Sequence, residues 1–256
     1  YLFIILHKIK YQKNILLNRC MEIDKKLLQY SPYLSYAGKT LEKILPNERI
    51  KKKRIKNLDV LYKFNSNGFR THEFDYEEDC CIALGCSYTM GTAMPIELMW
   101  PSKLEEHTGM KIYNLGIGGG SRDLCVRLAM GWIDVLKPKK VFCLWPFPKR
   151  FELITSNKEQ LTQSYRSYTK FEFAKFPVIN PFIEQYFEDD NNSEINTWKN
   201  KLMLEHICKE NNTELYHMDV NINNLNANAV TFGRDRRHKG VDFQNPITDL
   251  FIDLLN

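Results

Sequence analysis

The stretch CIALGCSYTMG, residues 81–91, begins as an apolar run and ends in small and polar residues. Its first part, Ile82 to Gly85, has the length and composition of a short strand that is covered on both faces. Ser87 falls where this strand gives way to a turn, shortly before Gly91. A serine in that place can be a catalytic nucleophile or an ordinary helix N-cap, so the rest of the chain has to decide between the two.

Apolar runs of strand length alternate with helical patterns after this stretch. Strands are predicted at 81–85, 111–117, 139–145 and 213–220, and helices near 97–107, at 122–136, at 194–210 and in the closing ITDLFIDLL. This alternation predicts an α/β protein with a parallel sheet and helices on both faces. Active groups gather at the carboxyl ends of such strands, where Ser87, a glycine cluster and the Trp145-Pro146 turn all fall.

The chain divides into a lead-in and one main domain. Residues 79–256 are predicted to form the main domain, with an insertion at about 151–192 where aromatic and polar residues break the alternation. Residues 1–78 are predicted to be a lead-in of helical and extended pieces. Residues 1–20 are interpreted as an over-extended reading frame or a fragment edge: YLFIIL is too short to span a bilayer, and its basic residues follow it instead of preceding it.

Charge and cysteine content narrow the function classes. The net charge of +5 is partly local, because residues 51–56 form a basic cluster that is more typical of a solvated face than of a nucleic-acid site. The seven cysteines include several inside apolar segments, a pattern typical of free, reduced thiols and of a reducing, cytoplasmic compartment. There is no C-x-x-C pair, so no metal site is predicted.

Two further motifs carry possible chemistry. GIGGGS, residues 116–121, follows the second predicted strand and lacks the P-loop spacing; it is either a tight turn or a place where backbone N–H groups face a developing oxyanion. In GRDRRHKG, residues 233–240, Asp235 could reach back to His238 and fix its tautomer. The other ring nitrogen of His238 would then be free to take a proton from a serine, although an ordinary charged loop has the same spacing.

Taken together, these three segments resemble the blocks of the SGNH (GDSL-like) hydrolase superfamily. Gly85, Cys86, Ser87 and Gly91 match its first block, with Cys86 in place of the usual Asp. The lead-in segment NSNGFR, residues 65–70, resembles one seen in some phage and marine-microbial members. The resemblance covers roughly the last two thirds of the chain. It implies a flavodoxin-like three-layer α/β/α sandwich with a central parallel sheet of about five strands.

The resemblance also implies roles for individual residues. Ser87 would be the nucleophile, His238 the general base and Asp235 the group that orients it. The backbone N–H groups of Ser87 and Gly119 would form the oxyanion hole, and Asn114 aligns with the Asn of the family's second block. Neither a metal nor an organic cofactor is implied.

Two departures from known patterns matter. Thr89 stands where the α/β-hydrolase elbow G-x-S-x-G has its second glycine, which favours the SGNH pattern. The SGNH family's third block, Gly-x-Asn-Asp, is missing, and LWPFPKRFE follows the third strand instead. Losing one oxyanion donor costs about 10²–10³ in rate. Arg150 could take over that task or be a salt-bridged surface residue, and with Asn114 and Trp145 it is a candidate contact for the substrate or the oxyanion.

Two hypotheses of different class follow. The first is a serine esterase that removes a small acyl group, such as acetyl from a carbohydrate, with a small ester or acylated glycan as its partner. The second is a module of the same fold that has lost efficient catalysis and binds a glycan or a partner protein, for example as a virion component. Convergence of Ser87, His238 and Asp235 would favour the first hypothesis.

Overall fold

The computed structural model describes the following parts of the chain: residues 25–41, 60–76, 79–154, 160–164, 190–221, 229–235 and 238–256. The segment 1–20, the basic cluster at 51–56 and most of the predicted insertion lie outside the described residues.

A four-stranded parallel sheet forms the centre of the molecule. Its strands are β4 (Lys111–Asn114), β3 (Cys80–Gly85), β5 (Lys140–Trp145) and β8 (Glu214–Asp219), in that spatial order. Neighbouring strands pair in parallel throughout. Each strand falls on one of the four predicted apolar runs, but β4 ends at Asn114 and not at residue 117 as predicted. About five strands were expected, and the described residues supply four of them.

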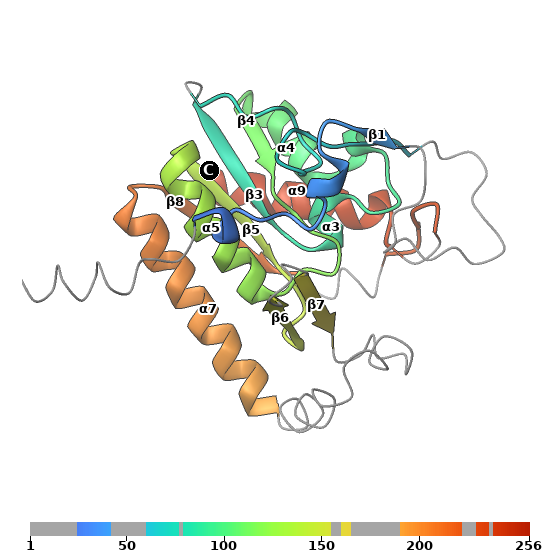
Figure 1. Ribbon diagram of the computed structural model, residues 1–256. Coiled ribbons are helices and arrows are strands. Elements are labelled where there is room, and N and C mark those ends of the chain that lie inside the picture. The colour runs from blue at the N-terminus through green and yellow to red at the C-terminus, as the bar shows by residue number, and fades with distance from the viewer. Residues whose placement is uncertain are drawn as a thin grey trace, which may run out of the picture.

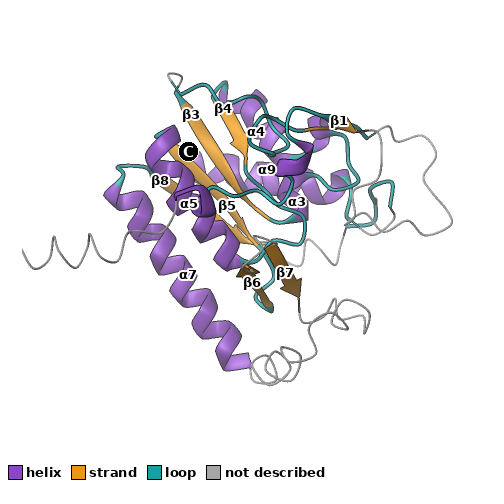
Figure 2. Cartoon of the chain, viewed as in Figure 1, coloured by secondary structure: helices purple, strands orange, loops and turns teal. Residues whose placement is uncertain are grey.

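Helices cover both faces of this sheet, so the predicted three-layer α/β/α architecture is confirmed (Figures 1 and 2). Helices α5 (Arg122–Leu136) and α7 (Asp190–Glu210) lie on one face, and α4 (Trp100–Thr108) and α9 (Val241–Leu255) lie on the other. All six residues of β3 are buried, with alternate side chains belonging to the two core clusters. A strand buried on both faces explains why its sequence is apolar without alternation.

Helix α9 begins earlier than its sequence predicted. The apolar pattern starts after Pro246, but the helix begins at Val241 and contains this proline. The side chain of Gln244, fully buried in the first turns, accepts a hydrogen bond from the Trp100 N–H at 3.1 Å and donates to the Tyr88 carbonyl at 3.4 Å. These contacts anchor the first turns, so tertiary packing overrides the helix-breaking tendency of proline.

The described lead-in packs on the α5 side of the main domain. It contains α2 (Lys25–Leu28), the 3-10 turn Leu34–Tyr36, and strands β1 (Thr40–Leu41) and β2 (Tyr62–Lys63), which pair antiparallel. Arg127 of α5 donates to three carbonyl oxygens of this segment at 2.8–3.1 Å. The lead-in is therefore attached to the sheet domain by partly buried hydrogen bonds.

A second pair of antiparallel strands follows β5. It consists of β6 (Arg150–Ile154) and β7 (Gln160–Ser164). The sequence analysis predicted an insertion at this point but no strands. Glu152 of β6 forms a two-pronged ion pair with Arg127 of α5, with both distances 2.8 Å, which fixes the start of the insertion against the domain.

Three general properties concern the described residues alone. None of their helices is both long and apolar enough to pass through a bilayer. The six cysteines among them are unbridged and buried, as the sequence predicted. No group of three or more His, Cys, Asp or Glu side chains in these segments is arranged to hold a metal ion.

Candidate active site

Ser87 lies at the carboxyl end of β3, as the sequence predicted. It is the first residue of the short helix α3 (Ser87–Met90), and the N-cap is Cys86 in an extended conformation. The N-cap interpretation of Ser87 is therefore wrong. The residue is 7% exposed, and its hydroxyl forms no hydrogen bond within the described part of the chain. A hydroxyl without a structural partner at a sheet edge is available for chemistry.

Gly85 sets the sharp turn from β3 into α3. Its φ is +156°, and a Cβ there would lie 2.1 Å from the Thr89 Oγ1 and 2.9 Å from the Leu144 carbonyl oxygen. Neither neighbour can retreat easily, since Thr89 belongs to α3 and Leu144 to β5. Glycine is the residue that allows α3 to fold back tightly onto the strand.

Replacing Gly85 by Ala is expected to lower the free energy of unfolding by about 1–3 kcal/mol through overpacking. Chemical denaturation measures this change. Gly109→Ala is the matched control, because Gly109 also has a positive φ (+67°) but no heavy atom within 4 Å of the added Cβ. Equal losses in the two variants would contradict the close packing of Gly85.

The glycine-rich turn after β4 presents backbone donors beside this helix. The Ile117 N–H donates to the Gly85 carbonyl at 3.1 Å, which extends the sheet by one step, and the Gly120 N–H donates to the Ile117 carbonyl at 2.9 Å. Gly119 has a φ of +80° and is half-buried, with open space beside its Cα. Within the described chain, the N–H groups of Gly119 and Ser87 donate to no acceptor. Both are free to bind an oxyanion.

Asn114 ties the glycine-rich turn to the helix of Ser87. Its Nδ2 donates to the Thr89 carbonyl at 2.6 Å, and its Oδ1 accepts from the Gly116 N–H at 2.9 Å. The side chain is 5% exposed. Asn114 was a candidate substrate contact, but both ends of its amide are engaged within the chain. Its role here is to hold two backbone segments together.

Asp235 and His238 form the hydrogen bond that their spacing allows. The His238 Nδ1 lies 2.7 Å from the Asp235 Oδ2, and the His238 backbone N–H donates to the other carboxylate oxygen at 3.0 Å. The Asp235 side chain is fully buried, whereas 12% of the His238 side chain is exposed. A buried carboxylate on Nδ1 leaves Nε2 as the nitrogen available to another group.

The loop of His238 adjoins the loop of Ser87. The His238 ring meets the ring of Tyr88 edge to face, with 5.9 Å between ring centres, and Tyr88 directly follows Ser87. The Arg234 N–H donates to the Ala93 carbonyl at 2.8 Å, which joins the two loops through their backbones. No hydrogen bond between Ser87 and His238 is formed in the described segments. Catalytic hydrogen bonds often tighten only when a substrate is bound.

Arg150 lies against the glycine-rich turn. Its Nη1 donates to the Gly120 carbonyl at 3.1 Å, and its guanidinium carbon lies 5.1 Å from the centre of the Phe147 ring. Among the described acidic side chains it has no ion-pair partner, which argues against the salt-bridged surface interpretation. Its guanidinium is therefore bound to the residue that follows Gly119.

Trp145, the remaining candidate contact, is fully buried at the end of β5. A substrate contact of Trp145 stays a prediction, because the structure shows only that this side chain is buried. The guanidinium carbon of Arg122 lies 5.8 Å from the centre of its ring, and Arg122 also forms an ion pair with Asp219 at the end of β8. Sequence analysis missed this ion pair, because nothing local connects the two residues.

The charges around Asp219 favour its ionised form. Burial alone would raise the pKa of Asp219, but the hydrogen bond from Lys201, at 2.8 Å, and the charge of Arg122 outweigh burial and hold that pKa below its usual value. A fixed network of one carboxylate and two cations therefore borders the carboxyl edge of β8.

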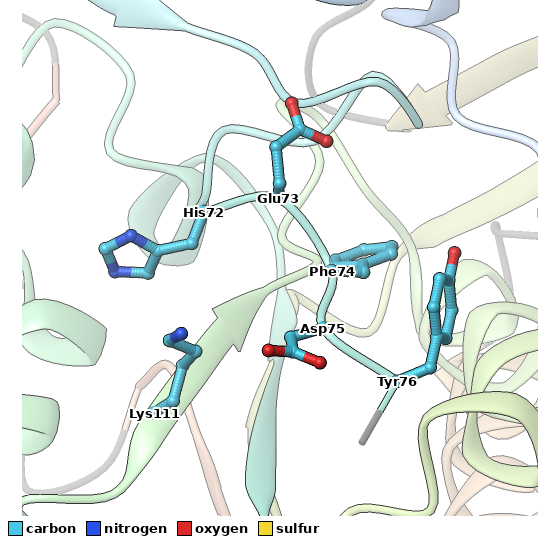
Figure 3. A pocket seen from close by; sticks show the side chains of 6 residues that line it. All are labelled: His72, Glu73, Phe74, Asp75, Tyr76 and Lys111. Atoms are coloured by element: carbon cyan, nitrogen blue, oxygen red, sulfur yellow. The ribbon is translucent and has the colours of Figure 1, made fainter. Parts of the chain in front are cut away.

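A surface hollow of about 650 Å³ lies elsewhere, at the start of β4 (Figure 3). It is lined by His72, Glu73, Phe74, Asp75, Tyr76 and Lys111. Glu73 points away from Lys111 in this view and accepts a hydrogen bond from the Ser66 N–H at 3.0 Å. Lys111 begins β4, whereas Ser87 follows the end of the parallel strand β3. The hollow therefore lies at the amino ends of the strands, and the candidate active site lies at their carboxyl ends.

Comparisons with known proteins find structural likeness only. No family model matches the chain, and a search of curated proteins finds no match. The similar solved structures include a psychrotrophic esterase, EstA from Pseudoalteromonas sp., at 12% identity and a TM-score of 0.40 over 70% of this chain and 97% of EstA. They also include a member of the lipolytic protein G-D-S-L family from Veillonella parvula, at 12% identity and a TM-score of 0.36 over 68% of this chain and 96% of that one.

A third similar structure is a variant of Axe2, an acetyl xylan esterase from Geobacillus stearothermophilus. It is 14% identical with a TM-score of 0.36, and the alignment covers 70% of this chain and 95% of that chain. Likeness at this level carries no argument about activity. The chemistry has to be argued from the residues of this chain.

Proposed function

We propose that this protein is a serine esterase, with Ser87 as nucleophile, His238 as general base and Asp235 as the residue that orients the imidazole. The observation that carries the proposal is the 2.7 Å contact between the buried Asp235 carboxylate and the His238 Nδ1, in a loop packed beside α3. A carboxylate placed in this way stabilises the imidazolium that forms when a serine loses its proton.

The reaction proceeds through an acyl-enzyme. The Ser87 Oγ attacks the ester carbonyl carbon while the His238 Nε2 takes the hydroxyl proton. The Ser87 and Gly119 N–H groups bind the oxyanion of the tetrahedral intermediate. As the ester C–O bond breaks, His238 returns the proton to the leaving alcohol, and the acyl group remains on Ser87. Water, deprotonated by His238, then attacks this acyl group. The bond between the acyl carbon and the Ser87 Oγ breaks, His238 returns the proton to that oxygen, and a carboxylic acid is released.

The proposed substrate is a small acyl ester, such as an O-acetyl group on a carbohydrate. This choice rests on the resemblance of the three sequence blocks to SGNH hydrolases. The reaction needs no metal or organic cofactor, because the proposed residues supply the nucleophile, the base and the oxyanion donors.

Hydrolysis of p-nitrophenyl esters of increasing acyl length tests the proposed activity. The proposal expects saturable turnover of the acetyl ester, falling as the acyl chain lengthens. An acetylated oligosaccharide, assayed by release of acetate, then tests the alcohol part of the substrate. A folded protein that hydrolyses none of these esters would contradict the esterase proposal.

Arg150 is proposed to supply the oxyanion donor that the missing third block would have provided. Replacing Arg150 by Met keeps much of the apolar stem and is expected to lower kcat by about 10²–10³, with little change in KM. Steady-state kinetics on p-nitrophenyl acetate measures the effect. Lys149→Met is the neighbouring control, since Lys149 forms an ion pair with Asp190 at the start of α7. If both substitutions lowered kcat equally, the loss would come from the missing positive charge alone, and the proposed donor role of Arg150 would be contradicted.

The absent Asn of the third block favours one alternative function. A module that kept the fold but lost efficient catalysis would bind an acylated glycan or a partner protein through the same edge of the sheet. It would bind an acetylated oligosaccharide without releasing acetate, and calorimetry combined with the acetate assay separates the two cases.

A further inference from the structure

Two arginines that are distant in sequence lie over one buried tyrosine beside the candidate active site. Tyr62, in β2, has no exposed surface. The guanidinium carbon of Arg70 lies 4.4 Å from the centre of its ring, and that of Arg234 lies 5.8 Å away. Cations at these distances are attracted by an aromatic face. Because Arg234 directly precedes Asp235, Tyr62 connects the lead-in to the loop of the proposed triad.

Arg70 holds the segment that follows Ser87. Arg70 is 1% exposed, and its guanidinium donates to the carbonyl oxygens of Gly91, Met90 (3.4 Å) and Met94 (3.0 Å). The Gly91 N–H in turn donates to the Ser87 carbonyl at 3.0 Å. A planar guanidinium can hold several carbonyl groups in fixed directions, which a lysine ammonium cannot reproduce.

Ala93 joins the two loops. Its N–H donates to the Tyr62 hydroxyl at 2.7 Å, and its carbonyl accepts from the Arg234 N–H at 2.8 Å. Its φ of +65° is unfavourable for a residue with a side chain and persists only where surrounding contacts hold it. The backbone of Gly233 approaches so closely that a Cβ there would lie 2.6 Å from the Ala93 carbonyl oxygen. A shift of Ala93 would therefore disturb both loops.

We propose that Tyr62 and Arg70 act as a positioning clamp, which holds the loop of Ser87 and the loop of Asp235 and His238 in one relative arrangement. The inference rests on the proposed esterase function for its catalytic consequence. Neither clamp residue is proposed to touch the substrate. This role explains why the lead-in segment NSNGFR, which ends in Arg70, belongs with the sheet domain.

Tyr62→Phe tests the clamp most sharply, because it keeps the ring beside both arginines and removes only the hydroxyl that accepts from Ala93. We expect kcat on p-nitrophenyl acetate to fall by about 10- to 100-fold, as small misplacements of reacting groups do, with KM little changed. Tyr113→Phe is the matched control: Tyr113 is also fully buried, and its hydroxyl accepts from the Asp75 N–H at the same 2.7 Å. This control is expected to keep the wild-type kcat.

Hydrogen exchange of backbone amides gives a readout that does not depend on activity. If the clamp exists, the backbone amides of Ala93 and Arg234 exchange faster than in the wild type in folded Tyr62→Phe. The same two amides are also expected to exchange faster in Arg70→Lys. Unchanged exchange at Arg234 would overturn the clamp, because the two loops would then be independent. An unchanged kcat in Tyr62→Phe with an active wild type would overturn its catalytic role. If the wild type hydrolyses no ester but both amides exchange faster, the clamp holds and the esterase proposal fails.

Discussion

Ser87→Ala is expected to abolish ester hydrolysis, lowering kcat on the order of 10⁶-fold if the residues act as a triad. The serine oxygen is the atom that forms the acyl-enzyme, so no other side chain can replace it. The substitution should barely affect folding, because the hydroxyl has no hydrogen bond within the described chain and its loss leaves no partner unsatisfied. We expect the free energy of unfolding to change by less than about 1 kcal/mol.

Ser193→Ala is the control for this experiment. Ser193 is likewise buried, at 3% exposed, and among the described residues its hydroxyl also has no hydrogen-bond partner, but it lies on α7. Kinetics on p-nitrophenyl acetate and denaturation of both variants separate a catalytic loss from a general effect of removing a buried hydroxyl. Residual turnover by Ser87→Ala at more than a few per cent of the wild-type rate would exclude Ser87 as the nucleophile.

Asp235→Asn is expected to lower kcat by about 10⁴ while the loop stays folded. The carboxylate accepts from both the His238 N–H and the His238 Nδ1. In Asp235→Asn the amide oxygen can accept the hydrogen bond from the His238 backbone, but the NH2 group that then faces the ring can only donate. Nδ1 therefore becomes the acceptor, and the imidazole carries its proton on Nε2. That nitrogen can then no longer accept the proton of Ser87. Steady-state kinetics near neutral pH measure the loss.

Asp242→Asn controls for the loss of a loop carboxylate. Asp242, in the first turn of α9, accepts a hydrogen bond from the Thr231 N–H at 2.7 Å, just before the loop of His238. Its replacement should cost far less activity than Asp235→Asn. In addition, the double variant Ser87→Ala/Asp235→Asn should have the same kcat as Ser87→Ala alone, because the effects of substituting residues that act as a unit do not add. Additive losses would contradict a shared role.

The parts of the fold that could be predicted are those whose sequence pattern is local. The apolar run of β3 and the helix at 122–136 were predictable from composition and period, and both are present. The start of α9 was not predictable, because Pro246 argues against a helix and only the distant contacts of Gln244 overcome it. Helix α7 has an unusual pattern, with Asn196 and Asn200 buried and Trp198 67% exposed, so its apolar residues did not indicate its buried face.

The same distinction holds for the candidate site. Asp235 and His238 are three residues apart, a spacing that allows their hydrogen bond, and the resemblance to the SGNH blocks turned this possibility into a prediction. Arg70 was quoted only within a resemblance, because a buried arginine bonded to carbonyl groups twenty or more residues away leaves no local signal. Trp145 was placed correctly at a strand end, whereas Asn114 was expected within a strand at 111–117 and in fact ends β4. Sequence position also does not reveal which way a side chain faces or whether its polar atoms are already engaged.

Covalent labelling with a fluorophosphonate probe, followed by mass mapping of the modified peptide, tests the central claim most directly. A serine activated by an adjacent imidazole attacks such a probe, whereas an ordinary serine does not. We expect one adduct, on Ser87, which is lost in His238→Ala although that variant remains folded. An adduct on another residue, labelling that survives in His238→Ala, or no adduct in folded wild-type protein would contradict it.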